Sequence, residues 1–215
     1  MITVHHLNKS RSTRVIWLLE ELGMPYEIVH HQRDPITSLA PESLRLIHPL
    51  SKAPIIVDTK VVDTKVVGEA TDKITLCESG AIMEYILNQA TAEQLRPAQD
   101  SSEYYHYVEW LHFAEGSLAL PVITKLIMSM ETRDGSQPLD HYIAKELALD
   151  FSYIEQTLSQ RPYFAGNSFT AADIMMAVML TMADNLALLE DKPQIKAYLA
   201  NVKLRKAYQV AISYE

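Results

Sequence analysis

The first third of the chain alternates short apolar runs with a helical pattern. Residues 1–7 and residues 26–31 have the apolar character of short strands. Between them, apolar side chains recur at the i, i+3, i+4 and i+7 positions of an amphipathic helix, at Val15, Leu18, Leu19 and Leu22. Gly23 follows directly and predicts the end of that helix. We therefore expect a β-α-β unit whose two strands pair in parallel through a right-handed crossover.

The next segment continues with strand patterns and a second helix. Residues 53–57 predict a strand, residues 61–76 an arm of a hairpin, and residues 79–87 a helix. The pentapeptide Asp-Thr-Lys-Val-Val occurs twice in tandem between Asp58 and Val67. We interpret the repeat as a duplicated hairpin extension, and a recognition loop is the less favoured alternative because surface loops tolerate insertions. Residues 1–89 are thus expected to form one small α/β domain.

The composition changes after Gln89. Residues 90–100 are polar, contain one proline and show no apolar period, which predicts a linker between two compact domains. Residues 101–215 show helical patterns and no strand pattern, so we expect an all-helical second domain. Helical spacing is clearest in the apolar residues Ile143, Leu147, Phe151, Ile154 and Leu158, and again in Ile195, Tyr198, Leu199 and Val202, which mark the last predicted helix.

Three local signals refine the helical half. Asp100 with Glu103 predicts a capping box at the start of a helix that runs towards Met130. Pro121 lies within that helix and should kink or break it. Thr170 and Asp173 form a second capping pattern, to which we assign a role in folding rather than chemistry.

Composition and charge narrow the class of protein. The 215 residues are 48% hydrophobic and 21% charged, which is ordinary for a globular protein. The net charge of -8, without a compact basic run, argues against nucleic acid as a partner. The first residues lack a secretory signal, and no apolar run approaches the length of a membrane span, so we expect no membrane association. The single cysteine, Cys77, excludes an internal disulfide framework and fits a cytoplasmic protein.

Four stretches of the chain together resemble one known family. They are His6-Leu-Asn-Lys-Ser-Arg-Ser-Thr-Arg14 with the helix that follows to Tyr26, His48-Pro-Leu-Ser-Lys-Ala-Pro54, Cys77-Glu-Ser-Gly-Ala-Ile82, and Arg161-Pro-Tyr-Phe-Ala-Gly-Asn-Ser-Phe-Thr-Ala-Ala-Asp173. Each is weak alone, but their order and spacing are specific. Over nearly the whole chain they resemble the glutathione transferases, in a form most similar to a bacterial and fungal branch. The resemblance implies a thioredoxin-like N-terminal domain, a helical-bundle C-terminal domain and a homodimer.

The resemblance also implies a set of glutathione-binding residues. It implies a cis bond between Ala53 and Pro54, which would leave the backbone of Ala53 free to pair with the cysteinyl residue of glutathione. Glu78 and Ser79 stand where a helix begins, so free N–H groups and the serine hydroxyl suit the γ-glutamyl carboxylate, while Glu78 or a neighbouring residue faces the ammonium. Lys52 would meet the glycine carboxylate. An ordinary helix cap and a solvated lysine are the alternative readings.

The loop after the first strand should stabilise the glutathione thiolate. Family members place a Tyr, Ser, Cys or an N–H group there, and this loop contains neither tyrosine nor cysteine. We take Ser10 as the donor, although Lys9 occupies the position of the family's usual serine. Asn8, Arg11, Ser12 or a backbone N–H are alternatives, and Ser12 is equally suited to cap the helix.

The implied activity is conjugation of the glutathione thiolate to small hydrophobic electrophiles, as in detoxification, with possible peroxidase activity on organic hydroperoxides. Glutathione would be a co-substrate and no metal is expected, because adjacent histidines on a strand, such as His5 and His6, point to opposite faces. Tyr107 and Trp110 share a helical face and are candidates for the electrophile pocket, for the core or for a subunit contact. Cys77 is interpreted as a small apolar residue. The alternative function is a non-catalytic glutathione-binding or protein-interaction module, because fold alone does not decide activity.

Overall fold

A computed structural model describes residues 1–59, 73–90 and 95–215. Most of the tandem repeat, residues 60–67, lies outside the described residues. The chain divides into two compact units, Met1–Ala92 together with Lys206–Glu215, and Glu93–Arg205. The division falls near the predicted linker, but it assigns the last ten residues to the first unit.

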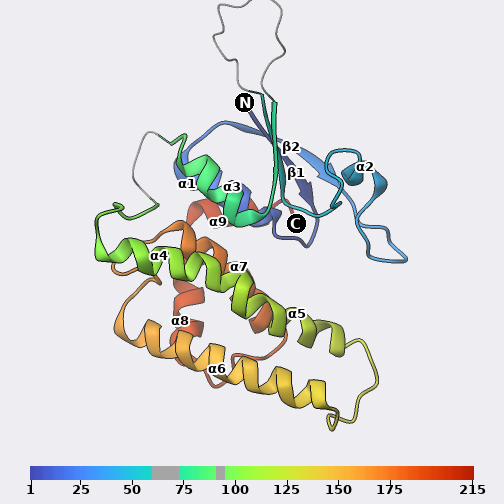
Figure 1. The fold of residues 1–215 in the computed structure, drawn as a ribbon, viewed down its shortest axis with the longest axis vertical. Helices are drawn as coiled ribbons and strands as arrows, with labels where there is room; N and C mark the ends of the chain where they lie inside the picture. Colours follow the sequence, from blue (N-terminus) through green and yellow to red (C-terminus); the bar gives the residue numbers. More distant parts are fainter. Residues whose placement is uncertain (60–72, 91–94) are drawn as a thin grey trace, which may run out of the picture. The chain divides into compact units, whose positions relative to one another are not determined.

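The first unit is built on a sheet of four strands (Figure 1). The strands are β1 (Ile2–Leu7), β2 (Tyr26–His31), β3 (Ile55–Thr59) and β4 (Lys73–Cys77), in the order β2-β1-β3-β4. β1 and β2 pair in parallel, as the β-α-β pattern predicts, while β3 is antiparallel to both of its neighbours. This mixed sheet, with helices α1 (Ser12–Leu22) and α3 (Ser79–Leu87), is the expected thioredoxin-like architecture. A short helix, α2 (Glu42–Arg45), was not predicted.

Helix α1 forms where the apolar period places it. Val15, Leu18 and Leu19 are fully buried, so the predicted apolar face is the face that contacts the core. Gly23 ends the helix in the left-handed conformation, with φ of 60°, and its N–H bonds the carbonyls of the last turn. The predicted helix and its end are therefore confirmed.

The helix α9 (Lys206–Ile212) departs from the sequence prediction. We expected the helix marked by Ile195 to Val202 to be the last one, and we expected all residues after the linker to belong to the helical domain. Instead, α9 packs on α1, with the rings of Trp17 and Tyr208 only 4.9 Å apart between centroids. The apolar surface that α9 covers comes from the first domain, so a local pattern in the sequence carries no sign of it.

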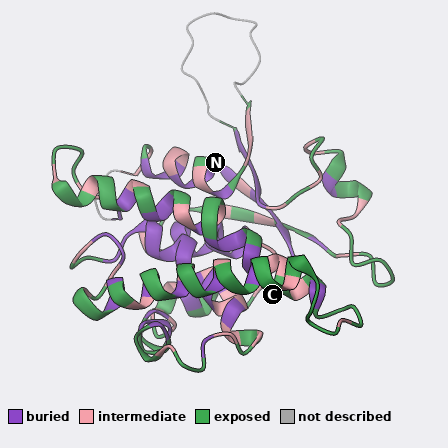
Figure 2. Cartoon of the chain, turned by 60° about the horizontal axis from the view of Figure 1, so that its bottom comes forward, coloured by how far each residue is buried: buried purple, intermediate pink, exposed green. Residues whose placement is uncertain are grey.

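The second unit is all-helical, as predicted. It contains α4 (Ser102–Phe113), a π-helical turn η1 (Ala114–Leu118), α5 (Ala119–Met128), α6 (Pro138–Gln160), α7 (Ala171–Asn185) and α8 (Pro193–Val202). Figure 2 shows buried residues along one side of the helices and exposed residues along the other. The predicted core residues of α6 and α8 are buried, namely Ile143, Leu147, Phe151, Ile154, Leu158, Ile195, Tyr198, Leu199 and Val202.

Two predictions about the first helix of this unit are wrong in detail. Ser101 stands at the N-cap of α4, without a side-chain capping bond, so the predicted box of Asp100 and Glu103 does not begin the helix. Pro121 lies inside α5, so it does not break the helix, and the kink stays a prediction. The π-helical turn directly before it absorbs the irregularity, since proline lacks the N–H that would continue an α-helical ladder.

The continuous helical stretch Ser102–Met128 is long and apolar enough to span a bilayer by length and composition, contrary to the sequence expectation. Its apolar side faces the interior of the helical unit, where Tyr107, Trp110 and Val122 have no exposed surface. In the most apolar part of this stretch, 39% of the residues are buried inside the structure, and Leu120 and Ile127 are exposed.

Candidate functional site

Strand directions bring the predicted site residues to one end of the sheet. β1 is antiparallel to β3 with His5 opposite Ile55, and β3 is antiparallel to β4 with Ile55 opposite Cys77. The chain therefore leaves β1, enters β3 and leaves β4 at the same end. The loop at residues 8–11, the Ala53-Pro54 bond and the start of α3 at Ser79 lie there together, although they are far apart in sequence.

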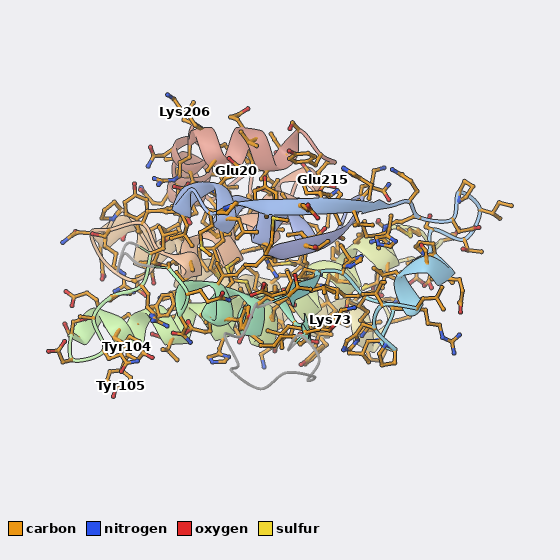
Figure 3. The ribbon with its side chains drawn as sticks, turned by 90° about the horizontal axis from the view of Figure 1, so that it is seen from above. Glu20, Lys73, Tyr104, Tyr105, Lys206 and Glu215 are labelled. Atoms are coloured by element: carbon orange, nitrogen blue, oxygen red, sulfur yellow. The ribbon has the colours of Figure 1, made fainter. Side chains whose placement is uncertain are left out.

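The loop at residues 8–11 is held by two side chains from elsewhere in the first unit. Arg33 donates to the carbonyls of Asn8 and Lys9, each at 3.1 Å, and its backbone N–H donates to the Asn8 side chain at 3.0 Å. The carboxylate of Glu215 accepts the Lys9 N–H at 2.5 Å and the hydroxyl of Thr13. Figure 3 labels Glu215 beside the blue N-terminal elements. Lys9 itself has a positive φ of 51°, so these contacts stabilise an unusual turn.

Ser10 is the half-buried hydroxyl of this loop. Its Oγ accepts the N–H of Ser12 at 3.1 Å and lies 2.7 Å from the Ser12 Oγ. Ser12 has no exposed surface and lies 2.8 Å from Nδ1 of His6. Of the two hydroxyls, Ser10 is therefore the one placed at the surface of the site, and Ser12 joins it to the interior. The N–H groups of Lys9 and Ser12, considered as thiolate donors from the sequence, already have acceptors.

His6 completes this hydrogen-bonded chain. Its Nε2 lies 2.9 Å from the carbonyl oxygen of Tyr214, and its ring meets His30 edge-on at 5.6 Å. Burial lowers the pKa of His6, and the nearby carboxylate of Glu215 and the Tyr214 carbonyl act in the opposite direction. Sequence reasoning considered His6 only as a metal ligand and missed this contact, because its partner is 208 residues away.

The bond between Ala53 and Pro54 is cis, as the family resemblance implies. Pro54 is buried and Ala53 is half-buried directly before β3. Lys52 is exposed, and its carbonyl accepts the thiol of Cys77 at 3.8 Å, which ties the loop to the end of β4. The backbone of Ala53 and the ammonium of Lys52 thus flank the same end of the sheet.

Helix α3 begins at the same place. Its N-cap residue, Glu78, is exposed and has a positive φ of 79°, a conformation that costs a residue other than glycine about 1–3 kcal/mol. Ser79 is buried, and its Oγ accepts a bond from Nη1 of Arg14 at 3.1 Å. Because Arg14 only donates, the Ser79 hydroxyl keeps its own hydrogen for another acceptor. The bond from Arg14, which is fully buried in α1, was not predicted from the sequence, because its partner lies 65 residues away.

Tyr107 and Trp110 are core residues of the helical unit in this structure. Both have no exposed surface, and the Trp110 ring stacks on Tyr153 at 5.0 Å and contacts Phe164 at 4.6 Å. The sequence left more than one role open for these two residues, and their burial matches a role in the core. Their role in an electrophile pocket remains a prediction.

The adjacent histidines divide between two networks, as expected for neighbours on a strand. Nδ1 of His5 lies 3.0 Å from Nε2 of His31, whereas His6 meets Ser12 and Tyr214. Among the residues that the structure describes, no group of three or more His, Cys, Asp or Glu side chains is arranged to hold a metal ion. Cys77 is half-buried, and burial raises the pKa of its thiol, which disfavours a reactive thiolate.

Comparison with known proteins agrees with this arrangement. Residues 10–89 match the glutathione S-transferase N-terminal domain and residues 118–205 the C-terminal domain. Glutathione S-transferase 3 of Schizosaccharomyces pombe is 34% identical, with 98% of this chain and 86% of the relative covered. Glutathione S-transferase 1 of Saccharomyces cerevisiae is 30% identical, with 97% and 92% covered. A glutathione S-transferase structure from Actinobacillus pleuropneumoniae has a TM-score of 0.83 at 29% identity, with 99% and 92% covered. The chain therefore belongs to the glutathione S-transferase family of transferase enzymes.

Proposed function

We propose that this transferase conjugates the thiolate of glutathione to small hydrophobic electrophiles. One observation carries the proposal: a half-buried hydroxyl, a cis-proline loop and the start of a helix with a buried serine meet at one end of the sheet. Family membership supports glutathione transfer in general. The class of electrophile is our inference from the implied conjugation chemistry.

Each part of glutathione has a partner at this end of the sheet. The backbone of Ala53 pairs with the cysteinyl residue in the manner of an added strand. The first N–H groups of α3 and the Ser79 hydroxyl bind the γ-glutamyl carboxylate, because a helix start offers free donors and a partial positive charge. Glu78 meets the γ-glutamyl ammonium, and Lys52 meets the glycine carboxylate. These pairings account for all the charged groups of the peptide.

We assign Ser10 to the thiol of a peptide bound in this way, because its loop follows β1 at the same end of the sheet. A hydroxyl that donates to an anion contributes about 1.5–3 kcal/mol. This corresponds to a thiol pKa lowered by about one to two units from roughly 8.5. The resulting thiolate attacks the electrophilic carbon and displaces its leaving group as an anion. With an organic hydroperoxide, the same thiolate attacks the terminal oxygen and breaks the O–O bond, which gives a sulfenic acid and an alkoxide that takes a proton from water to become the alcohol. A second glutathione then converts the sulfenic acid to the disulfide and releases water.

The proposal is tested by calorimetric titration with glutathione and by thiolate absorbance in the ultraviolet at neutral pH. Turnover is then measured with an activated aryl chloride and with an alkyl hydroperoxide. Ser10→Ala should retain glutathione affinity and lose most of the thiolate signal and turnover. Ser159→Ala is the control, because that exposed hydroxyl donates only to a carbonyl of its own helix. Absence of glutathione binding at millimolar concentration refutes the proposal, and unchanged turnover in Ser10→Ala refutes the assigned role of Ser10.

We further propose, from the family resemblance, that the protein acts as a homodimer in the cytoplasm. Light scattering during size-exclusion chromatography measures its mass in solution, and a monomer at micromolar concentration contradicts the first part. Cell fractionation tests the second part.

A further inference from the structure

The hydrogen bonds from Ser10 to the interior have only one consistent direction while His6 is neutral. The carbonyl of Tyr214 cannot donate, so Nε2 of His6 carries the hydrogen that bridges their 2.9 Å separation. In a neutral imidazole Nδ1 is then an acceptor, and the hydroxyl of Ser12 donates to it at 2.8 Å, with the carbonyl of Leu7 as a more distant acceptor at 3.4 Å. Because Ser12 has one hydrogen, the 2.7 Å contact between the serines is donated by Ser10.

This direction conflicts with the task proposed for Ser10. A hydroxyl stabilises a thiolate only by donating to it, yet the single hydrogen of Ser10 points to Ser12. Ser10 also accepts the N–H of Ser12 at 3.1 Å. Because Ser10 is the acceptor in that bond, the bond does not change where the hydroxyl hydrogen of Ser10 points. If His6 gains a proton at Nδ1, every bond of the chain reverses: His6 donates to Ser12, Ser12 donates to Ser10, and Ser10 is free to donate outward.

We propose that Ser10, Ser12 and His6 form a proton relay that takes up the thiol proton of bound glutathione. The inference rests on the proposed function of the site. The S–H bond breaks, and its proton goes to Ser10. The Ser10 proton passes to Ser12, and the Ser12 proton passes to Nδ1 of His6. The products are a thiolate, two intact hydroxyls and an imidazolium, and no electrons are exchanged. Ser10 now donates to the thiolate. His6 does not touch the substrate, so it is a positioning residue.

The groups around His6 come from β2 and from the segment after α9. On β2, His30 meets the ring edge-on, and His31 lies near it while bonded to His5 on the other face. From the segment after α9, Tyr214 supplies the carbonyl and Glu215 supplies a carboxylate. Burial is the largest influence on the pKa of His6 and lowers it, as the neighbouring His30 does, whereas the Glu215 carboxylate and the Tyr214 carbonyl favour the imidazolium. The free site therefore holds a neutral His6 with a counter-ion already in place.

The position of Glu215 is fixed by the loop that carries Ser10. Its carboxylate accepts the N–H of Lys9 and the hydroxyl of Thr13. The loop and the carboxylate are therefore held together, with the relay beside them. When the thiolate forms, the proton stays within the site, so the net charge of the site does not change. In a partly buried site this is less costly than an isolated thiolate.

The number of protons released on binding distinguishes the relay from simple ionisation. Near pH 7 most glutathione in solution carries its thiol proton. If binding yields a thiolate without a relay, about one proton per thiolate enters the buffer. With the relay, that proton remains on His6 and release is close to zero. Calorimetry in two buffers of different ionisation enthalpy measures the protons released, and ultraviolet absorbance measures the thiolate in the same samples.

Three variants separate a relay from a structural role. His6→Asn places an amide oxygen near the position of Nδ1, so it still accepts from Ser12 but cannot take up a proton. Ser12→Ala interrupts the relay and leaves the bond from His6 to Tyr214 in place. We expect both variants to bind glutathione with an affinity within a few-fold of the parent protein. In each variant, either the amount of thiolate at pH 7 should fall about tenfold, or about one proton per thiolate should be released to the buffer. His141→Gln is the control, because that exposed histidine lies in α6, outside the first unit and outside the hydrogen-bonded chain, and it should behave like the parent protein.

The outcomes are distinct. A thiolate in the parent protein with close to zero proton release, and the expected changes in the two relay variants, supports the inference. Release of about one proton per thiolate by the parent protein overturns the inference without any variant. A His6→Asn protein with the same amount of thiolate and the same proton release as the parent protein also overturns it. Failure of the parent protein to bind glutathione refutes the proposed function instead. Thermal unfolding of each variant identifies any variant that does not fold. In that case the proton release of the parent protein still tests the inference.

Discussion

The hydroxyl of Thr170 provides the sharpest test of how the helical unit is stabilised. Thr170 and Asp173 form the predicted capping box at the start of α7, and both side chains are buried. The carboxylate of Asp173 accepts the N–H and the hydroxyl of Thr170, at 2.8 Å and 3.0 Å, and also the N–H of Phe164 and the hydroxyl of Tyr198. Thr170→Val keeps the shape of the side chain and removes only its hydrogen-bonding group.

Two terms set the size of the effect. Loss of an N-cap hydroxyl costs about 1 kcal/mol. Loss of a donor to a buried carboxylate costs a further 1.5–3 kcal/mol or so. We therefore expect Thr170→Val to lower the free energy of unfolding by about 3 kcal/mol, or the melting temperature by roughly 6–12 °C. Thr170→Ser keeps the hydroxyl and loses one methyl group, so its cost should be about 1 kcal/mol.

Urea denaturation followed by circular dichroism measures both variants against the parent protein. The difference between Val and Ser at position 170 isolates the hydroxyl, since both replacements are small and neutral. Equal destabilisation by the two variants refutes the reasoning, because it assigns the effect to packing of the methyl group. A loss below about 1 kcal/mol in Thr170→Val contradicts the magnitude taken for a bond to a buried charge.

Three further predictions follow from other parts of the structure. Burial raises the pKa of Asp173 to about 6 from 3.8, so the folded state binds a proton that the unfolded state has released between these pH values. Stability from this group is present at low pH and lost as pH rises through 6. Urea unfolding should show a fall of about 2 kcal/mol from pH 4 to pH 6 in the parent protein relative to Asp173→Asn. Gly23→Ala should cost about 1 kcal/mol in the same assay because of the positive φ at the end of α1, and no loss contradicts the assigned conformation. If Ser79 binds the γ-glutamyl carboxylate, calorimetry should show about tenfold weaker glutathione binding in Ser79→Ala, and parent-like affinity removes Ser79 from the site.

At the end of the sheet, the family resemblance predicted the positions of the site residues but not the hydrogen bonds that hold their loop. The cis bond at Pro54 and the start of α3 at Ser79 are as expected, and Ser10 lies at the surface of its loop. The bonds that hold that loop were not expected. Arg33 and Glu215 contact it through side-chain atoms, and no spacing rule connects residue 9 with residue 215.

Taken by itself, the sequence determined the order of strands and helices in the first domain apart from the short α2, the parallel pairing of the first two strands, the end of α1 at Gly23 and the core positions of α6 and α8. These features follow from local conformational preferences and from the apolar periods of the α-helix and the β-strand, which depend only on residues close together in the sequence. Only the tertiary structure decided that α9 covers α1, that a π-helical turn precedes Pro121, and that His6 lies between Ser12 and Tyr214. Such contacts join side chains from distant segments, and their partners are selected by packing in three dimensions rather than by any pattern along the chain.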